Sequence, residues 1–298
     1  MNELERYLAE EIALDHRDGH LTRREALRRL AALGLGGASA AALLTACGST
    51  GGPSSASAQS SASSSSSSAE LPPSSPTEEI RWSGPTGDLM GAWVAAPQPR
   101  GAVLVIHENK GLNDHTRHVA GRFAHRGYSA LAIDLLSTEG GTAAFTDPAE
   151  ATAALGKAPP ERHTAQLKSG LDELARRSPG VKLAAIGFCF GGGLTWRLIG
   201  VKDERLAAAA PFYGPFFDGA DFVGAKTAVL GVYADDDDRV NKTRDAAKSA
   251  LEAAKLTYEL VSYPGQHAFF NDTRERYNAQ SAKVAWDKVL AWFGAHVG

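Results

Sequence analysis

The feature that most constrains this chain is an alternation of continuous apolar runs with helix-like segments between residues 77 and 298. The runs GAVLVIH (101–107) and VKLAAIGF (181–188) are largely apolar, as expected of strands buried on both faces. Residues 159–177, in contrast, carry leucines at helical spacing. Strands and helices that alternate in this way form crossover units, so we predict an α/β fold with a mostly parallel sheet and helices on both faces.

The remaining predicted elements extend this pattern. Two strands, 79–84 and 89–97, are expected to pair in antiparallel fashion at the edge of the sheet. Further strands are predicted at YSALAID (128–134), RLAAAAPFYG (205–214), KTAVLGVYA (226–234) and TYELVSYP (257–264), and helices at 115–126, 192–200 and 285–297. Such sheets place their ligand sites at the carboxyl ends of the strands, so we expect the chemistry to follow these runs directly.

The first 47 residues have the layout of an export signal. Arg23 and Arg24 precede an apolar Ala/Gly/Leu-rich run of about 15 residues, shorter than the roughly 20 that span a membrane. The paired arginines resemble a twin-arginine signal, and LTAC (44–47) resembles the lipobox of bacterial lipoproteins, whose cysteine is lipidated and becomes the new N-terminus. A buried amphipathic helix is the alternative, but GLGGASAAA offers little side chain for packing. We predict export and anchoring through Cys47 to the outer face of a bacterial membrane.

A low-complexity segment follows the predicted lipidation site. Residues 48–76 are mostly Ser, Ala, Gly and Pro. Such a segment buries too little apolar surface to offset the entropy lost on ordering its backbone, so we expect a flexible tether. The predicted organisation is therefore an export signal (1–47), a tether (48–76) and an α/β domain (77–298).

Charge and cysteine content exclude several classes of protein. The formal net charge of -3 gives no reason to expect a nucleic-acid partner. Two cysteines cannot build a disulfide framework, so packing must hold the core together. If Cys47 is lipidated, the other cysteine has no resolving partner in its own chain, which argues against a thiol redox protein.

The second cysteine, Cys189, lies between a predicted strand and a predicted helix within GFCFGGG. Gly187 and Gly191 flank it in a G-x-C-x-G pattern, and a nucleophile on a sharp strand-to-helix turn requires such small neighbours. A helix N-terminus favours a thiolate, and the amide of Phe190 could donate to a developing oxyanion. A buried structural cysteine and a nucleotide-binding loop are alternatives, although the segment lacks the Lys and Ser/Thr of a phosphate loop. We expect no cofactor.

A nucleophile of this kind requires an acid and a base later in the chain, in that order. YADDDDRV ends a predicted strand in four aspartates, 235–238, most of which we expect to be solvated residues at a helix start. His267 follows the last predicted strand, where it could act as the base while one aspartate orients its ring. A loop histidine with a single hydrogen bond is the alternative.

The segment VIHENKGLNDH begins at the end of the strand at 101–107 and supplies further candidate residues at the carboxyl edge of the sheet. Glu108 stands out because a carboxylate near a thiol raises the pKa of that thiol and would keep it protonated; a surface glutamate is the alternative. His107, His115 and His118 have charged, helical neighbours and no supporting carboxylate or thiol spacing, so we predict no metal site.

Taken together, these motifs resemble the dienelactone hydrolase (carboxymethylenebutenolidase) family of α/β hydrolases over residues 78–297. The resemblance lies in HEN-GL (107–112), DLLS (134–137), GFCFGG (187–192), YADDDDRV (233–240) and GQHAFFN (265–271). It implies the α/β-hydrolase fold, Cys189 as nucleophile, His267 as base, Asp237 as the triad acid, Glu108 as the resting partner of the thiol, and the amides of Phe190 and Asn109 as oxyanion donors.

The resemblance also has a departure, which concerns the substrate. Family members that bind the dienelactone carboxylate use arginines, one of them four residues after the catalytic histidine, where this chain has Asn271. We therefore expect a small-molecule lactone or ester substrate. The alternative function is an extracytoplasmic binding protein that has kept the fold and lost turnover.

Overall fold

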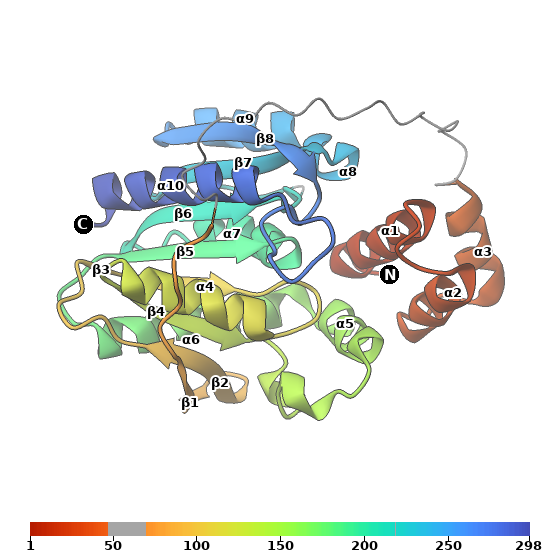
Figure 1. Cartoon of the computed structure of the whole chain (residues 1–298), viewed down its shortest axis with the longest axis horizontal. Helices are drawn as coiled ribbons and strands as arrows, with labels where there is room; N and C mark the ends of the chain where they lie inside the picture. The colour runs from red at the N-terminus through yellow and green to blue at the C-terminus, as the bar shows by residue number, and fades with distance from the viewer. Residues whose placement is uncertain (47–69, 218) are drawn as a thin grey trace.

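The computed structural model describes residues 1–46, 70–217 and 219–298, and comprises an α/β domain with three N-terminal helices beside it (Figure 1). The predicted lipidation site Cys47 and most of the predicted tether, 48–69, lie outside the described residues. Residues 70–76 of that tether are described and lie against helix α4 (Asp114–His125), where the Ser75 amide donates to the carbonyl of Gly121.

An eight-stranded sheet forms the centre of the domain, in the order β1-β2-β4-β3-β5-β6-β7-β8. The edge strands β1 and β2 pair in antiparallel fashion, β2 is antiparallel to β4, and all remaining pairs are parallel. The strands are β1 Glu78–Gly84, β2 Gly87–Val94, β3 Gly101–Ile106, β4 Tyr128–Asp134, β5 Leu183–Phe188, β6 Leu206–Phe212, β7 Ala228–Asp236 and β8 Tyr258–Gln266. The predicted mostly parallel α/β sheet is therefore confirmed.

Helices cover both faces of this sheet, with α4 and α10 on one face and α6 and α7 on the other (Figure 1). Every residue of β3, β4 and β5 is buried, which explains why these strands are such continuous apolar runs. The other helices of the domain are α5 Pro148–Lys157, α6 Pro160–Arg177, α7 Phe190–Gly200, α8 Asp238–Asn241, α9 Arg244–Ala253 and α10 Ala279–His296, with short 3₁₀ turns η1 Ser137–Glu139 and η2 Thr142–Ala144.

The N-terminal segment, interpreted from sequence as an export signal, forms α1 Glu3–Arg17, α2 Arg23–Ala32 and α3 Gly37–Ala46. Asn2 and Glu5 form a capping box at the start of α1. Leu4, Leu8 and Ile12, spaced four residues apart, form a buried stripe on this helix. The prediction of an export signal over residues 1–47 did not include this packing. None of the described helices is long and apolar enough to cross a membrane.

The three N-terminal helices lie at the edge of the domain toward which the parallel strands point (Figure 1). Helix α1 packs beside α5, and a Cβ at Gly156 of α5 would lie 3.0 Å from the Leu8 side chain. The carboxyl ends of the strands, where a site is expected, are therefore covered by α1.

Candidate functional site

Cys189 occupies the turn between β5 and α7, as the N-cap residue of that helix. Its φ of 55° and ψ of −116° are rare for a residue with a side chain, so the turn is strained. A Cβ at Gly187 would lie 2.2 Å from the carbonyl oxygen of Gly191, and a Cβ at Gly191 would lie 2.5 Å from that of His107. The glycines flanking Cys189 are thus required by close backbone approach.

The loop after β8 brings His267 to the same edge. The Nδ1 atom of His267 lies 2.5 Å from a carboxylate oxygen of Asp237, which follows β7 directly. Asp237 is buried, whereas its neighbours Asp235, Asp236 and Asp238 are exposed. Burial raises the pKa of the Asp237 carboxyl, but His267, Arg239 and the Val240 amide together lower it by more, so the carboxylate form is favoured. One aspartate of the acidic run is therefore placed to orient this imidazole.

The thiol of Cys189 is covered by two side chains of α1. Its Sγ donates to the carboxylate of Glu11, with 3.3 Å to Oε2, and lies 3.4 Å from the hydroxyl oxygen of Tyr7. The side-chain amide of Asn109 donates to the same Glu11 carboxylate over 2.9 Å. The two contacts of the sulfur join residues 182 and 178 positions apart in the chain, and neither Tyr7 nor Glu11 was singled out from the sequence.

The surroundings of the thiol favour its protonated form. Burial is the largest cause that raises the pKa of Cys189, and the carboxylates of Glu11 and Glu108 raise it further. The hydrogen bond with Tyr7 and the charge of Arg239 lower it, but they do not offset this increase. Only 2% of the Cys189 surface is exposed. In this arrangement the resting cysteine is a neutral, covered thiol.

Glu108, expected from the resemblance to be the resting partner of the thiol, hydrogen-bonds to other groups. Its Oε2 accepts from the Asn271 side-chain amide at 2.9 Å and from Arg274 at 3.0 Å. Burial raises the pKa of this carboxyl, but Arg274, His115 and His267 outweigh that effect and lower it. Glu108 acts on Cys189 through its charge, and the carboxylate that contacts the sulfur is that of Glu11.

The two candidate oxyanion donors flank this region. Phe190 is the first residue of α7, directly after Cys189. Asn109 is buried after β3, and its carbonyl accepts a hydrogen bond from Thr152.

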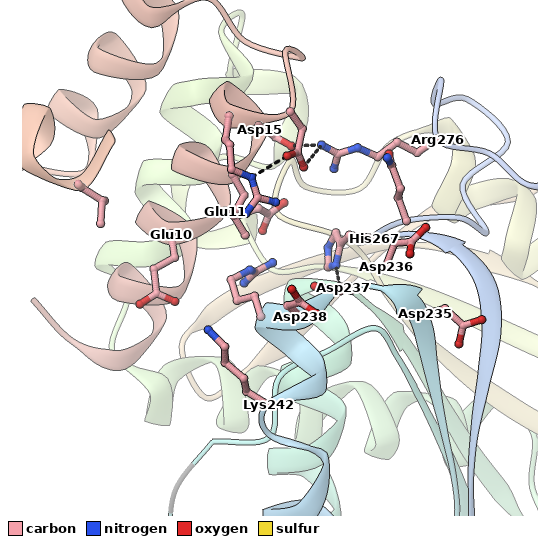
Figure 2. A pocket seen from close by; sticks show the side chains of 16 residues that line it. Glu10, Glu11, Asp15, Asp235, Asp236, Asp237, Asp238, Lys242, His267 and Arg276 are labelled. Atoms are coloured by element: carbon pink, nitrogen blue, oxygen red, sulfur yellow. Dashed lines mark hydrogen bonds and ion pairs between the residues drawn. The ribbon is translucent and has the colours of Figure 1, made fainter. Parts of the chain in front are cut away.

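A pocket of about 600 Å³ adjoins the site between α1 and the ends of β7 and β8. Figure 2 shows Glu10, Glu11 and Asp15 on one side of it and His267 with the aspartates 235–238 on the other. Arg276 reaches across from the loop after β8 and binds Asp15 over 2.7 Å. This pocket is acidic, and α1 forms one of its walls.

One group of side chains could hold a metal ion. Within the described residues, a carboxylate oxygen of Glu11, the sulfur of Cys189 and a ring nitrogen of His267 lie within 4.8 Å of one another. Carboxylate, thiolate and imidazole are zinc ligands, so the set could bind that ion once the thiol is deprotonated. His107 and His115 are buried and separately hydrogen-bonded, and His118 is exposed on α4.

Comparison with known proteins places the domain among hydrolases. Residues 90–297 match the sequence model of the dienelactone hydrolase family. A candidate carboxymethylenebutenolidase of Escherichia coli K12 is 31% identical over 230 residues, covering 71% of this chain and 84% of that protein. Another, from Saccharolobus solfataricus, is 30% identical over 243 residues, covering 69% and 94%. The crystal structure of a candidate dienelactone hydrolase from Klebsiella pneumoniae is 29% identical, with a TM-score of 0.65, and covers 74% of this chain and 100% of its own.

Proposed function

Since the chain belongs to the dienelactone hydrolase family and is a lactone or ester hydrolase, we propose that Cys189 is its nucleophile, His267 its base and Asp237 the acid that orients the histidine. The observation that carries this proposal is the contact of His267 with Asp237 at 2.5 Å beside a cysteine on a strained strand-to-helix turn. The Nε2 atom of His267 is buried and has no hydrogen-bond partner among the described residues, which suits an atom that must accept a proton.

The proposed reaction has two halves. His267 takes the thiol proton, the thiolate attacks the carbonyl carbon, and the carbon–oxygen bond breaks as the histidine protonates the leaving alkoxide. A water molecule, activated by the same histidine, then hydrolyses the thioester and releases the carboxylic acid and the free thiol. The amides of Phe190 and Asn109 would stabilise the negative oxygen in both halves.

The substrate class follows from this chemistry. Thiolates cleave esters with good leaving groups more readily than amides, so we propose activated esters and enol lactones, in keeping with the carboxymethylenebutenolidase names of the relatives. At the position of the family's carboxylate-binding arginine, the side chain of Asn271 donates to Glu108.

Kinetics with p-nitrophenyl acetate test the triad on residues 70–298, which lack α1 but contain the whole family match. We expect Cys189→Ala to lower kcat/KM by more than about a thousandfold and Asp237→Asn by a similar factor, because each removes a member of one catalytic unit. Asp235→Asn is the matched control: it removes the same charge at an exposed position of the same acidic run. Hydrolysis that survives Cys189→Ala unchanged would refute the proposal.

We also propose that the protein is exported and lipid-anchored at Cys47. Arg23 and Arg24 begin α2 and are exposed, so a receptor that reads paired arginines could reach them while α1 is packed. Lipid chains on Cys47 would then provide the only attachment to the membrane.

Fractionation of a bacterial host that produces the full chain tests the anchor. We expect the wild-type protein in the membrane fraction and Cys47→Ala in the soluble fraction, because the substitution removes the acylated atom. Cys47→Ser, which replaces the sulfur by oxygen in a side chain of similar shape, should behave like Cys47→Ala. An unchanged membrane fraction for both variants would rule out lipidation at this residue.

A further inference from the structure

The carboxyl edge of the sheet is a surface already occupied by a segment of the same chain, helix α1. The contacts run along the whole helix: the Asn2 side chain donates to the carbonyl of Gly156 over 3.0 Å, and Asp15 binds Arg276 at the other end. Between these ends, Leu4 and Leu8 are completely buried. Helix α1 is therefore docked over its full length.

Arginines of the domain contact side chains of α1 at three points. Glu3 binds Arg197 of α7, and Asp15 binds Arg276 of the loop after β8. The guanidinium of Arg239 stacks on the Tyr7 ring, with 4.1 Å from Cζ to the ring centroid. An acidic helix thus faces arginines from three separate elements of the domain.

The docked helix occupies the space that a substrate needs. For hydrolysis, an ester carbonyl carbon must reach the Cys189 sulfur while His267 takes the thiol proton. Instead, the sulfur contacts Glu11 and Tyr7, and its proton is directed to the Glu11 carboxylate. With both side chains in place, only 2% of the Cys189 surface is exposed, which obstructs the approach of an ester or a thiol reagent to the sulfur.

The family fold does not include this helix. The family match begins at residue 90, after α1, α2, α3 and the first strand. Helix α1 therefore lies outside the part of the chain that matches the family.

We propose that α1 is an intramolecular inhibitor of the hydrolase, in which Glu11 and Tyr7 hold Cys189 as a covered thiol until the helix leaves. This inference rests on the proposed function, because an inhibitor requires that Cys189 be the nucleophile. The covering of the thiol can nevertheless be measured separately. Processing at the predicted lipidation site would separate residues 1–46, and α1 with them, from the catalytic domain. Activity would then begin after export.

The test uses the full chain in a Cys47→Ser background, where Cys189 is the only thiol. Leu8→Asp places a charge in the buried face of α1 without altering a group that contacts the sulfur. We expect iodoacetamide to alkylate Cys189 at least about tenfold faster in this variant, because a tenfold change requires a shift in the docking equilibrium of only about 1.4 kcal/mol. Val284→Asp, which changes an exposed apolar residue of α10 in the same way, should leave the rate unchanged.

Exchanging the two charges of one ion pair distinguishes release of α1 from misfolding of the variant. Asp15→Arg should accelerate alkylation by repelling Arg276, and Asp15→Arg with Arg276→Asp should restore the slow rate by re-forming the pair in reverse. Equal rates in wild type, Leu8→Asp and Asp15→Arg would overturn the inference. The inference would also be overturned if a chelator accelerated alkylation of the wild type as much as Leu8→Asp does. That result would mean that a metal ion bound to Glu11, Cys189 and His267 covers the thiol.

Ester hydrolysis by the same proteins separates the two proposals. Faster alkylation without any hydrolysis would support the inhibitory helix and refute the triad. If the wild-type chain hydrolyses the ester and is alkylated as fast as Leu8→Asp, the result would support the triad and refute the inhibitory helix.

Discussion

At the scale of single residues, the chemistry depends on which carboxylate contacts the Cys189 sulfur. Glu108 is held by Arg274 and Asn271, which leaves the thiol to Glu11 of α1. Because burial and the Glu11 charge both raise the pKa of the thiol, the docked helix favours the protonated sulfur. Departure of α1 would remove the Glu11 charge and the cover that Glu11 and Tyr7 provide, and would leave His267 as the neighbouring base.

This coupling predicts a pH dependence. Docking places the Glu11 carboxylate against the thiol and so raises the thiol pKa, which means that docking is at full strength below the thiol pKa of the open state and weakens as the pH rises from that value to the higher thiol pKa of the docked state. In pH profiles of iodoacetamide alkylation, we expect the half-maximal rate of Leu8→Asp to lie at lower pH than that of the wild-type chain, both in the Cys47→Ser background. Coincident profiles would mean that α1 does not influence the ionisation of Cys189.

At the scale of elements, the sequence predicted what local pattern determines. Strands β3, β4 and β5 could be recognised because both of their faces are buried, and the turn at Cys189 because its glycines are adjacent in sequence. Helices α5 and α9 were not foreseen, since both are alanine-rich with few large apolar residues. The docking of α1 could not be predicted in this way, because it depends on contacts with segments that are distant in the sequence.

At the scale of the whole molecule, a segment with the layout of an export signal and a hydrolase domain fold against each other (Figure 1). The paired arginines are exposed on α2, while α1 covers the nucleophile. In the proposed account, one segment both directs export and keeps the thiol covered, and its removal ends both roles together.

The most direct test of the central claim is the mass of the acyl-enzyme. Residues 70–298, mixed with p-nitrophenyl acetate and quenched in acid within the first turnover, should gain one acetyl group that peptide mapping places on Cys189. The same domain with Cys189→Ala should gain none and should not turn over. An acetyl group on another residue, or turnover by the Cys189→Ala domain at the wild-type rate, would contradict the account.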